Sequence, residues 1–217
     1  MPFARELAAL DDIGSGRLTL GIGAGGVGAD ATVLGEPVLA PRDRAARLEE
    51  FVELLHLVLT SPSTTWRGRH YAAATTTLAC QQQPRLPFVV AANGPRTMRL
   101  AARYGAGWVT TGTYRRDSGV DDETWWSGVA AVAGRFDEVM DEAGRDPLTV
   151  DRMLSVDAAP TFSLTSLETF TDAVGRAAEL GFSDVVVHWP LPGAPVYAAP
   201  ESVLDDVAAA LPAVRSP

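Results

Sequence analysis

Short apolar runs alternate with longer amphipathic stretches along nearly the whole chain. Apolar runs too short for a helix predict strands over residues 17–23, 88–92, 106–110, 154–158 and 184–188. Stretches with apolar residues every three or four positions predict helices over 3–13, 43–60, 95–104, 123–143 and 165–181, and Pro200 is expected to open a last one. Because each strand is followed by a helical segment, the strands are expected to pair in parallel through right-handed crossovers. The pattern predicts an α/β fold, either a doubly wound sheet or a (β/α) barrel.

The stretch 61–87 departs from this rhythm. It is long, lacks a helical period and contains short extended pieces around Trp66 and Tyr71. We expect an irregular insertion over about 61–87 at one end of the fold. No linker, low-complexity segment or repeat interrupts the rest, so 217 residues of ordinary globular composition indicate a single domain over 1–217.

A strand, a turn and a helix follow one another directly in residues 88–104. Asn93-Gly94-Pro95 breaks the strand, Pro95 suits the first position of a helix, and Gly105 caps its end. The N–H groups at a helix N-terminus that follows a strand form a natural seat for an anion, usually a phosphate. We therefore expect this turn to hold the phosphate of a cofactor.

Small, polar and ring-bearing residues concentrate at the carboxyl ends of the predicted strands, while the strand bodies are largely Val, Leu and Ile. These ends are residues 23–26, 92–95, 110–113, 158–160 and 188–190. Ligands of parallel α/β folds bind at the carboxyl ends of the strands. The asymmetry predicts a ligand site at this edge.

The run from Gly23 to Gly28 also satisfies G-x-G-x-x-G after a strand, which resembles a dinucleotide-binding fingerprint. That mechanism needs a helix to open immediately, yet residues 29–41 contain Gly35, Pro37 and Pro41 and show no helical stripe. No second strand ending in an acidic residue follows about 20 residues on. A glycine turn that lets a ligand approach the backbone is the better interpretation.

Charge and composition limit the classes of partner and of site that are expected. A net charge of −9 and a pI near 4.8 argue against nucleic acid or an anionic membrane surface as the main partner. Cys80 is the only cysteine, and the three histidines are scattered without acidic neighbours at ligand spacing, so no disulfide framework or metal site is predicted. No apolar run approaches the ~18 residues of a membrane helix, and no signal-peptide pattern follows Met1. A cytoplasmic location is expected.

Several segments in this order resemble the luciferase-like family of flavin- or deazaflavin-dependent oxidoreductases. They are LAALDD at 7–12, GSGRL at 14–18, GIGAGG at 21–26, LGEP at 34–37, the Arg44/Arg47/Glu50 helix, WRGRHY at 66–71, AANGP at 91–95, LAARYGAGW at 100–108 and VVVHWP at 185–190. Their order and spacing, rather than any one motif, carry the resemblance over nearly all of the chain.

The resemblance implies a partial TIM (β/α)8 barrel in which strands four to eight are present. GIGAGG then ends the fourth strand, AANGP the fifth, GWVTTG the sixth and HWP the eighth. The chain begins in the helix after the third strand, so about three strand–helix units are expected to be absent. A misassigned start, a decayed gene or a partner chain that completes the barrel would each account for this.

The resemblance also implies a cofactor site, for either FMN or coenzyme F420. The residues expected to hold the cofactor's ribityl-phosphate arm are Gly23, Ala24, Gly25, Gly26, Ala92, Asn93, Gly94, Pro95, Thr110 and Thr111. His188 is the candidate catalytic residue, because its imidazole could hydrogen-bond a flavin edge or a substrate carbonyl. A structural histidine that holds a loop at the strand end is the equally weighted alternative.

The expected function is that of an oxidoreductase acting on a small organic substrate. With FMN the family implies oxygen activation and monooxygenation, and with coenzyme F420 it implies hydride transfer. The alternative is a non-catalytic relative that binds flavin or completes a partner chain, and a third option is a non-flavin (β/α) protein acting on phosphorylated metabolites. Homodimers are common in the family, so a homodimer is a further expectation.

Overall fold

The computed structural model describes residues 2–26, 29–76 and 85–214 of the chain. The chain divides into two compact units, residues 1–107 and 108–217, each with its own helices and strands. Parallel strands occur in both units, which confirms the α/β class, and neither unit closes a barrel by itself. The expectation of a single domain over 1–217 stays a prediction.

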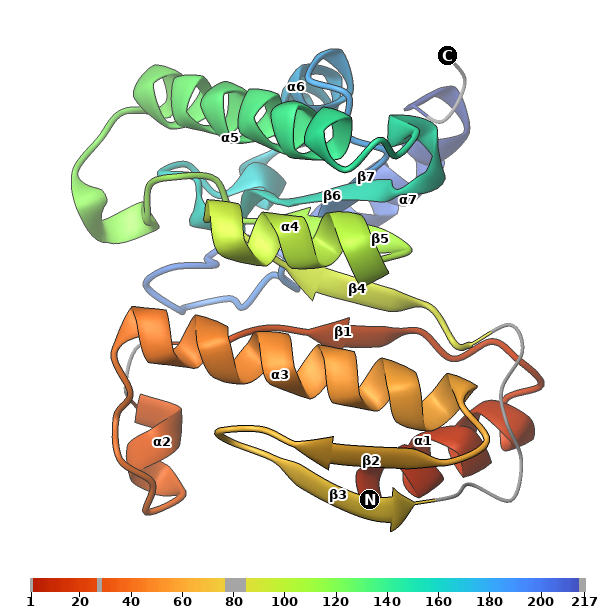
Figure 1. The fold of residues 1–217 in the computed structure, drawn as a ribbon. Coiled ribbons are helices and arrows are strands. Elements are labelled where there is room, and N and C mark those ends of the chain that lie inside the picture. The colour runs from red at the N-terminus through yellow and green to blue at the C-terminus, as the bar shows by residue number, and fades with distance from the viewer. Residues whose placement is uncertain (1, 27–28, 77–84, 215–217) are drawn as a thin grey trace. The chain divides into compact units, whose positions relative to one another are not determined.

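The first unit contains two parallel strands, a hairpin and four helices (Figure 1). In chain order these are α1 (Pro2–Ile13), β1 (Leu20–Ile22), α2 (Ala29–Val33), α3 (Pro41–Thr60), β2 (Thr64–Arg67), β3 (Ala72–Thr76), β4 (Phe88–Ala91) and α4 (Pro95–Tyr104). The register of β1 on β4 pairs Leu20 with Phe88 and Ile22 with Val90. Because the pairing is parallel, the carboxyl ends of both strands lie at the same edge.

Helices α3 and α4 enclose the core of this unit. Val52 and Leu59 of α3, Phe88 and Val90 of β4 and Met98 of α4 are fully buried. The apolar positions of α3 recur every three or four residues, so one face of the helix can be buried while the other stays in water. Pro41 starts the helix at a position that needs no backbone N–H.

The expected insertion over 61–87 contains an antiparallel hairpin. Strands β2 and β3 pair Trp66 with Ala73 and Arg67 with Ala72, which confirms the short extended pieces around Trp66 and Tyr71. The hairpin is fastened to α3 by the carboxylate of Glu50, described below. Cys80 lies outside the described residues.

The second unit alternates three strands and three helices. In chain order these are β5 (Gly107–Thr110), α5 (Asp122–Glu142), β6 (Asp151–Ser155), α6 (Leu167–Glu179), β7 (Asp184–Val186) and α7 (Val203–Val214), with single 3-10 turns η1 (Arg116–Ser118), η2 (Pro147–Thr149), η3 (Val156–Ala158) and η4 (Ser163–Thr165). The strand order is β5-β6-β7, and β6 pairs with β7 in parallel, Met153 opposite Asp184.

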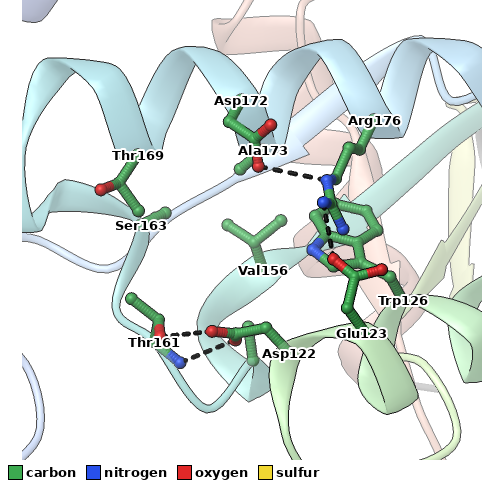
Figure 2. Close-up of a pocket in the computed structure, with 11 residues that line it drawn as sticks. Asp122, Glu123, Trp126, Val156, Thr161, Ser163, Thr169, Asp172, Ala173 and Arg176 are labelled. Carbon is green, nitrogen blue, oxygen red and sulfur yellow. Dashed lines mark hydrogen bonds and ion pairs between the residues drawn. The ribbon is translucent and has the colours of Figure 1, made fainter.

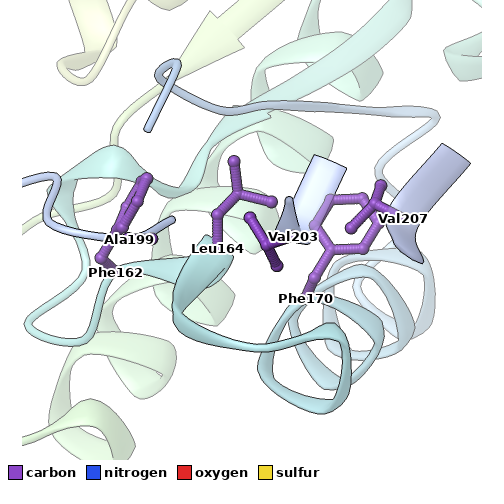
Figure 3. Packing of buried hydrophobic residues seen from close by; sticks show 6 residues of the cluster. All are labelled: Phe162, Leu164, Phe170, Ala199, Val203 and Val207. Atoms are coloured by element: carbon purple, nitrogen blue, oxygen red, sulfur yellow. The ribbon is translucent and has the colours of Figure 1, made fainter. Parts of the chain in front are cut away.

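Aromatic rings form much of the second unit's core. Trp108 and Phe136 are buried and stacked, with ring centroids 4.0 Å apart. A further cluster joins η4, α6 and α7 and is shown in Figure 3; its buried members are Phe162, Leu164, Phe170, Ala199, Val203 and Val207. These contacts hold the segment after β6 against the last two helices.

Four sequence predictions need correction. The second strand of this unit, β6, runs over Asp151–Ser155 rather than 154–158, and the last helix begins at Val203, after a turn closed by Val203 N–H donating to Pro200 O. Helix α6 starts at Leu167 with Ser166 as its cap, because the Ser166 side chain accepts from Thr169 N–H. Residues 29–41, predicted to be loop, contain the five-residue helix α2.

Arg152 explains why the start of β6 was missed. It is a charged residue inside a strand, yet its side chain is only 12% exposed. Its guanidinium pairs with Asp137 at 2.7 Å and lies over the rings of Trp108 and Phe182 at 5.5 and 5.6 Å. The aliphatic stem and aromatic contacts let a cation occupy a position that the apolar pattern reserves for Val or Leu.

Candidate functional site

The glycine turn after β1 lies where the sequence predicts a ligand. Gly23 approaches the neighbouring strand so closely that a Cβ there would be 3.3 Å from the Cβ of Ala91. Gly25 has φ +82°, a left-handed backbone that side chains disfavour. Gly26 offers its carbonyl to Arg44, whose Nη1 donates to it at 2.9 Å. The turn therefore leaves space beside Gly25 and is joined to helix α3 through Arg44.

A cavity of about 240 Å³ opens beside this turn. One wall is formed by Ile22 of β1 and by Gly23, Ala24 and Gly25 of the turn; the rest comes from α3 and from Tyr71 at the hairpin. We call it the basic pocket, because Arg44 and Arg47 of α3 both line it and none of its lining residues is acidic. The spacing of these arginines by three residues puts them on one face of the helix.

Arg44 is the most informative member of the basic pocket. One of its nitrogens holds the Gly26 carbonyl, but its Nε is buried and has no partner among the described residues. A buried N–H of a charged group without an acceptor is energetically unfavourable. An anionic ligand in the pocket would satisfy it.

Rings of Phe51 and Tyr71 close the other side of the basic pocket. Their centroids are 5.7 Å apart. Burial raises the pKa of Tyr71 and Glu50 adds to that effect, while Arg47 opposes it. Tyr71 is therefore a neutral phenol that can donate a hydrogen bond.

Glu50 positions Tyr71. Its carboxylate accepts from the backbone N–H groups of Arg69, His70 and Tyr71, at 3.1, 3.0 and 2.8 Å, and from Trp66 Nε1 at 3.2 Å. Burial opposes ionisation, but these hydrogen bonds together outweigh it and lower the pKa of Glu50 below its ordinary value. Gly68 makes the approach feasible, because a Cβ there would lie 1.7 Å from Glu50 Oε1.

The second predicted turn, Ala92 to Pro95, lies at the same edge as the glycine turn. Gly94 precedes α4 and Pro95 is its first residue, as the sequence predicted. Gly94 at the cap position has no side chain with which to cap the helix. Residues 92–95 do not line the basic pocket.

The arginine nearest this turn is already engaged. Arg96 pairs with Glu49 of α3, its Nε donating to Oε2 at 2.8 Å. That bond raises the pKa of Arg96 further. Arg96 thus joins α4 to α3.

The remaining predicted residues belong to the second unit. Thr110 is buried at the end of β5, and its Oγ1 accepts from Gly112 N–H at 3.1 Å. Thr111 is exposed beside it. Gly112 adopts φ +77°, so the chain turns directly after the strand.

His188 is exposed and belongs to a cluster of strand-end loops. Its ring stacks on Tyr197 with centroids 4.0 Å apart, and its Nδ1 lies 2.9 Å from Trp189 O. Its backbone N–H donates to Asp157 Oδ1 at 2.7 Å. These contacts hold the imidazole against Tyr197, and its catalytic role stays a prediction.

Arg116 ties the same loops together. It donates to Asp157 O at 2.8 Å and to Pro160 O at 3.1 Å, and lies 5.5 Å from the centre of the Tyr197 ring. Sequence reasoning assigned no role to Arg116, since nothing in its charged loop marks a partner about 40 residues away. Arg44 and Arg47 were part of the resemblance but not of the predicted site; their i, i+3 spacing after a glycine turn was the available signal.

Two kinds of feature are not found in the described residues. Across residues 2–26, 29–76 and 85–214, no three His, Cys, Asp or Glu side chains are grouped so that they could hold a metal ion. Within the same residues no helix has the length and apolar character needed to span a bilayer.

Comparison with known proteins identifies similar sequences. The family described as luciferase-like monooxygenase matches residues 1–166. The F420-dependent glucose-6-phosphate dehydrogenase of Beutenbergia cavernae is 31% identical over 137 residues, which cover 63% of this chain and 40% of that protein. The 4-hydroxyprotoasukamycin monooxygenase of Streptomyces nodosus subsp. asukaensis is 32% identical over 160 residues, 69% of this chain and 38% of that protein. The chain spans about two fifths of the length of these relatives.

Solved structures share the fold at low sequence identity. An F420-dependent secondary alcohol dehydrogenase, solved with an F420–acetone adduct, superposes with a TM-score of 0.67 at 17% identity, covering 85% of this chain and 68% of that one. The coenzyme F420-dependent tetrahydromethanopterin reductase of Methanopyrus kandleri gives 0.60 at 15% identity, covering 85% and 72%. The fold is that of the luciferase-like barrels, present here in part.

Proposed function

The chain belongs to the luciferase-like monooxygenase family. We therefore propose that it functions as an oxidoreductase that uses FMN or coenzyme F420 to act on a small organic substrate. The observation that carries the proposal is the basic pocket beside the glycine turn. There a strand end meets two arginines, one of which has a buried N–H without an acceptor among the residues that the structure describes.

The basic pocket fits the phosphate of such a cofactor. The chain as a whole carries a charge of −9, so a phosphate group is repelled unless local donors attract it. Arg44 and Arg47 supply that local charge, and the backbone at Gly25 has no side chain that would block a close approach. The N-terminus of α4, at the same strand edge, offers further N–H donors.

The protein's own part in the reaction is binding and orientation. When bound, FMN or coenzyme F420 supplies the redox chemistry. Arg44 and Arg47 neutralise the charge of the phosphate arm, while Phe51 and the neutral phenol of Tyr71 give the arm an apolar contact and a hydrogen-bond donor. We assign the same supporting role to Gly23, Ala24, Gly25 and Gly26.

We assign less specific roles to the other predicted site residues. Asn93, Gly94 and Pro95, with Ala92, form the second strand end of the first unit, and Thr110 and Thr111 form the corresponding strand end of the second. We propose that they contact the cofactor as well. His188 remains the candidate to hydrogen-bond the ring or the substrate, from a position set by Tyr197.

Coenzyme F420 with glucose 6-phosphate is the first pair to test, because several relatives are named F420-dependent glucose-6-phosphate dehydrogenases. The purified chain is titrated with FMN, coenzyme F420 and riboflavin, and cofactor fluorescence gives the three affinities. Turnover is then followed as loss of F420 absorbance on addition of the sugar phosphate, or as substrate-dependent oxidation of reduced FMN.

Three outcomes separate the candidate functions. Binding of a phosphorylated cofactor with substrate-dependent turnover supports the oxidoreductase. Tight binding without turnover on any substrate supports a flavin-binding relative that is not itself an enzyme. If sugar phosphates raise the melting temperature and neither cofactor does, the protein acts on phosphorylated metabolites and the proposal is wrong.

A further inference from the structure

The second unit contains a separate pocket of about 240 Å³ between the start of α5, the segment after β6, and α6 (Figure 2). We call it the acidic pocket. Asp122 and Glu123 come from the first turn of α5, and Asp172 comes from α6. Figure 2 shows Arg176 between Asp172 of its own helix and Glu123 of α5. The indole of Trp126 and the methyl groups of Val156 and Ala173 complete the wall.

Negative charge exceeds positive charge in this pocket, since its lining includes three carboxylates and one guanidinium. Arg176 engages one oxygen of each neighbour: its Nη2 lies 2.7 Å from Glu123 Oε1 and its Nε 3.2 Å from Asp172 Oδ2. The second oxygen of each carboxylate has no partner among the described residues. The site is rich in acceptors and poor in donors.

Ser163 is the second, independent indication of a ligand. Its side chain lines the acidic pocket and is only 2% exposed, yet its Oγ has no hydrogen-bond partner in the part of the chain that the structure describes. Buried hydroxyl groups are nearly always satisfied, because an unpaired one destabilises the fold. A ligand that enters the pocket would provide the missing partner.

From these observations we propose that the acidic pocket binds a small organic cation, a primary amine. An ammonium group carries three donors and no acceptor, which matches a site of carboxylate oxygens and the Ser163 hydroxyl. The half-buried ring of Trp126 adds the aromatic surface that favours organic cations. A metal ion does not fit, because the carboxylates are not grouped as metal ligands among the described residues.

The test uses the full chain with 1,4-diaminobutane as probe and 1,4-butanediol as its neutral analogue. Calorimetric titration gives the affinities, and chemical shifts of the Trp126 indole N–H report binding at this site. We expect the diamine to bind at least roughly tenfold more tightly than the diol. Equal binding of the two, or a shift only at other tryptophans, would overturn the proposal.

Variants separate a built site from diffuse attraction to an acidic protein. Asp172→Asn should weaken diamine binding about tenfold, whereas Glu168→Gln, which removes one charge from the same helix outside the pocket, should change it less than about twofold. Equal losses in both variants would mean non-specific attraction and would refute the site.

Ser163→Ala distinguishes a ligand group from a structural one. It should weaken diamine binding several-fold while leaving the melting temperature unchanged or higher, because it removes a buried hydroxyl that the protein itself does not satisfy. A lower melting temperature with unchanged affinity would show that Ser163 serves the fold and not a ligand.

Discussion

The two pockets have the same volume, about 240 Å³, and opposite charge. The basic pocket of the first unit presents Arg44 and Arg47, and the acidic pocket of the second is lined by three carboxylates and by Arg176. Volume alone therefore says little about what either accepts. The sign of the local charge selects the ligand class, a phosphate in one and an amine in the other.

The pockets also differ in how their walls are held. In the first unit, Glu50 fastens the hairpin that carries Tyr71, and its carboxylate is occupied by backbone N–H groups and does not line the pocket. In the second, Asp122 fastens Thr161 through two hydrogen bonds of 3.1 and 2.5 Å and lines the pocket itself. The carboxylate that holds the wall therefore lies outside the basic pocket in the first unit, whereas in the second unit it is part of the lining of the acidic pocket.

Removing the carboxylate of Glu50 should have the largest effect. Glu50→Ala leaves the N–H groups of residues 69–71 without their acceptor, so we expect a loss of about 2–3 kcal/mol in the free energy of unfolding. Asp122→Ala, whose carboxylate serves one exposed residue, should lose about 1 kcal/mol or less. Urea unfolding measures both free energies. Equal losses would contradict the inference that Glu50 holds its pocket wall more strongly than Asp122 holds its own.

The contribution of Glu50 should also depend on pH. Its pKa is lower in the folded protein than its ordinary value of 4.5, so its stabilisation is complete above that value and is lost as pH falls through the folded pKa. The stability difference between wild type and Glu50→Gln should be largest at neutral pH and shrink as the pH falls below 4.5. A difference that grows on acidification would reverse the assigned sign.

Arg44→Gln should abolish most of the preference for a phosphorylated flavin. We expect the ratio of FMN to riboflavin affinity to fall about tenfold, because a charge-assisted bond to the phosphate is lost. Arg42→Gln removes an exposed charge from the same helix outside the pocket and is the matched control. A similar fall in the control would assign the preference to net charge.

Gly25→Ala should destabilise the glycine turn by about 1–2 kcal/mol, because residue 25 has φ +82°. Gly21→Ala, in the adjacent strand with open space around its Cβ, should be neutral or slightly stabilising. The two variants are compared by urea unfolding and by FMN affinity. Loss of affinity in Gly25→Ala alone would tie the turn to the cofactor.

His188→Phe should have the smallest effect on stability, less than about 0.5 kcal/mol, since a phenyl ring can keep the stack on Tyr197. If the imidazole is catalytic, kcat should fall while KM for the substrate changes little. If the wild type turns over substrate and the variant has the same kcat, His188 is not catalytic. It is then the structural residue that the sequence analysis gave as the alternative.

The elements that were predicted well are those whose signals are local. Helix α4 begins at Pro95 and ends before Gly105, because proline and glycine mark its ends within the sequence itself. Gly105 is required there for space rather than for an unusual backbone, since a Cβ would lie 2.7 Å from Ala101 O. Strand β6 was placed too late, because the cation–ring contacts of Arg152 come from residues far along the chain.

The sequence by itself determined the alternation of strands and helices, the resemblance to the luciferase-like family and the two turns at the strand ends. These follow from periodicity, proline and glycine, which act over a few residues. The three-dimensional arrangement was needed to show that Tyr71 lines the same pocket as Arg44 and Arg47 and that Arg116 holds the loops around Tyr197. It was also needed to show that Ser163 lines an acidic pocket and that its Oγ has no partner among the described residues. Such contacts join residues 20 to 80 positions apart, and no local pattern records them.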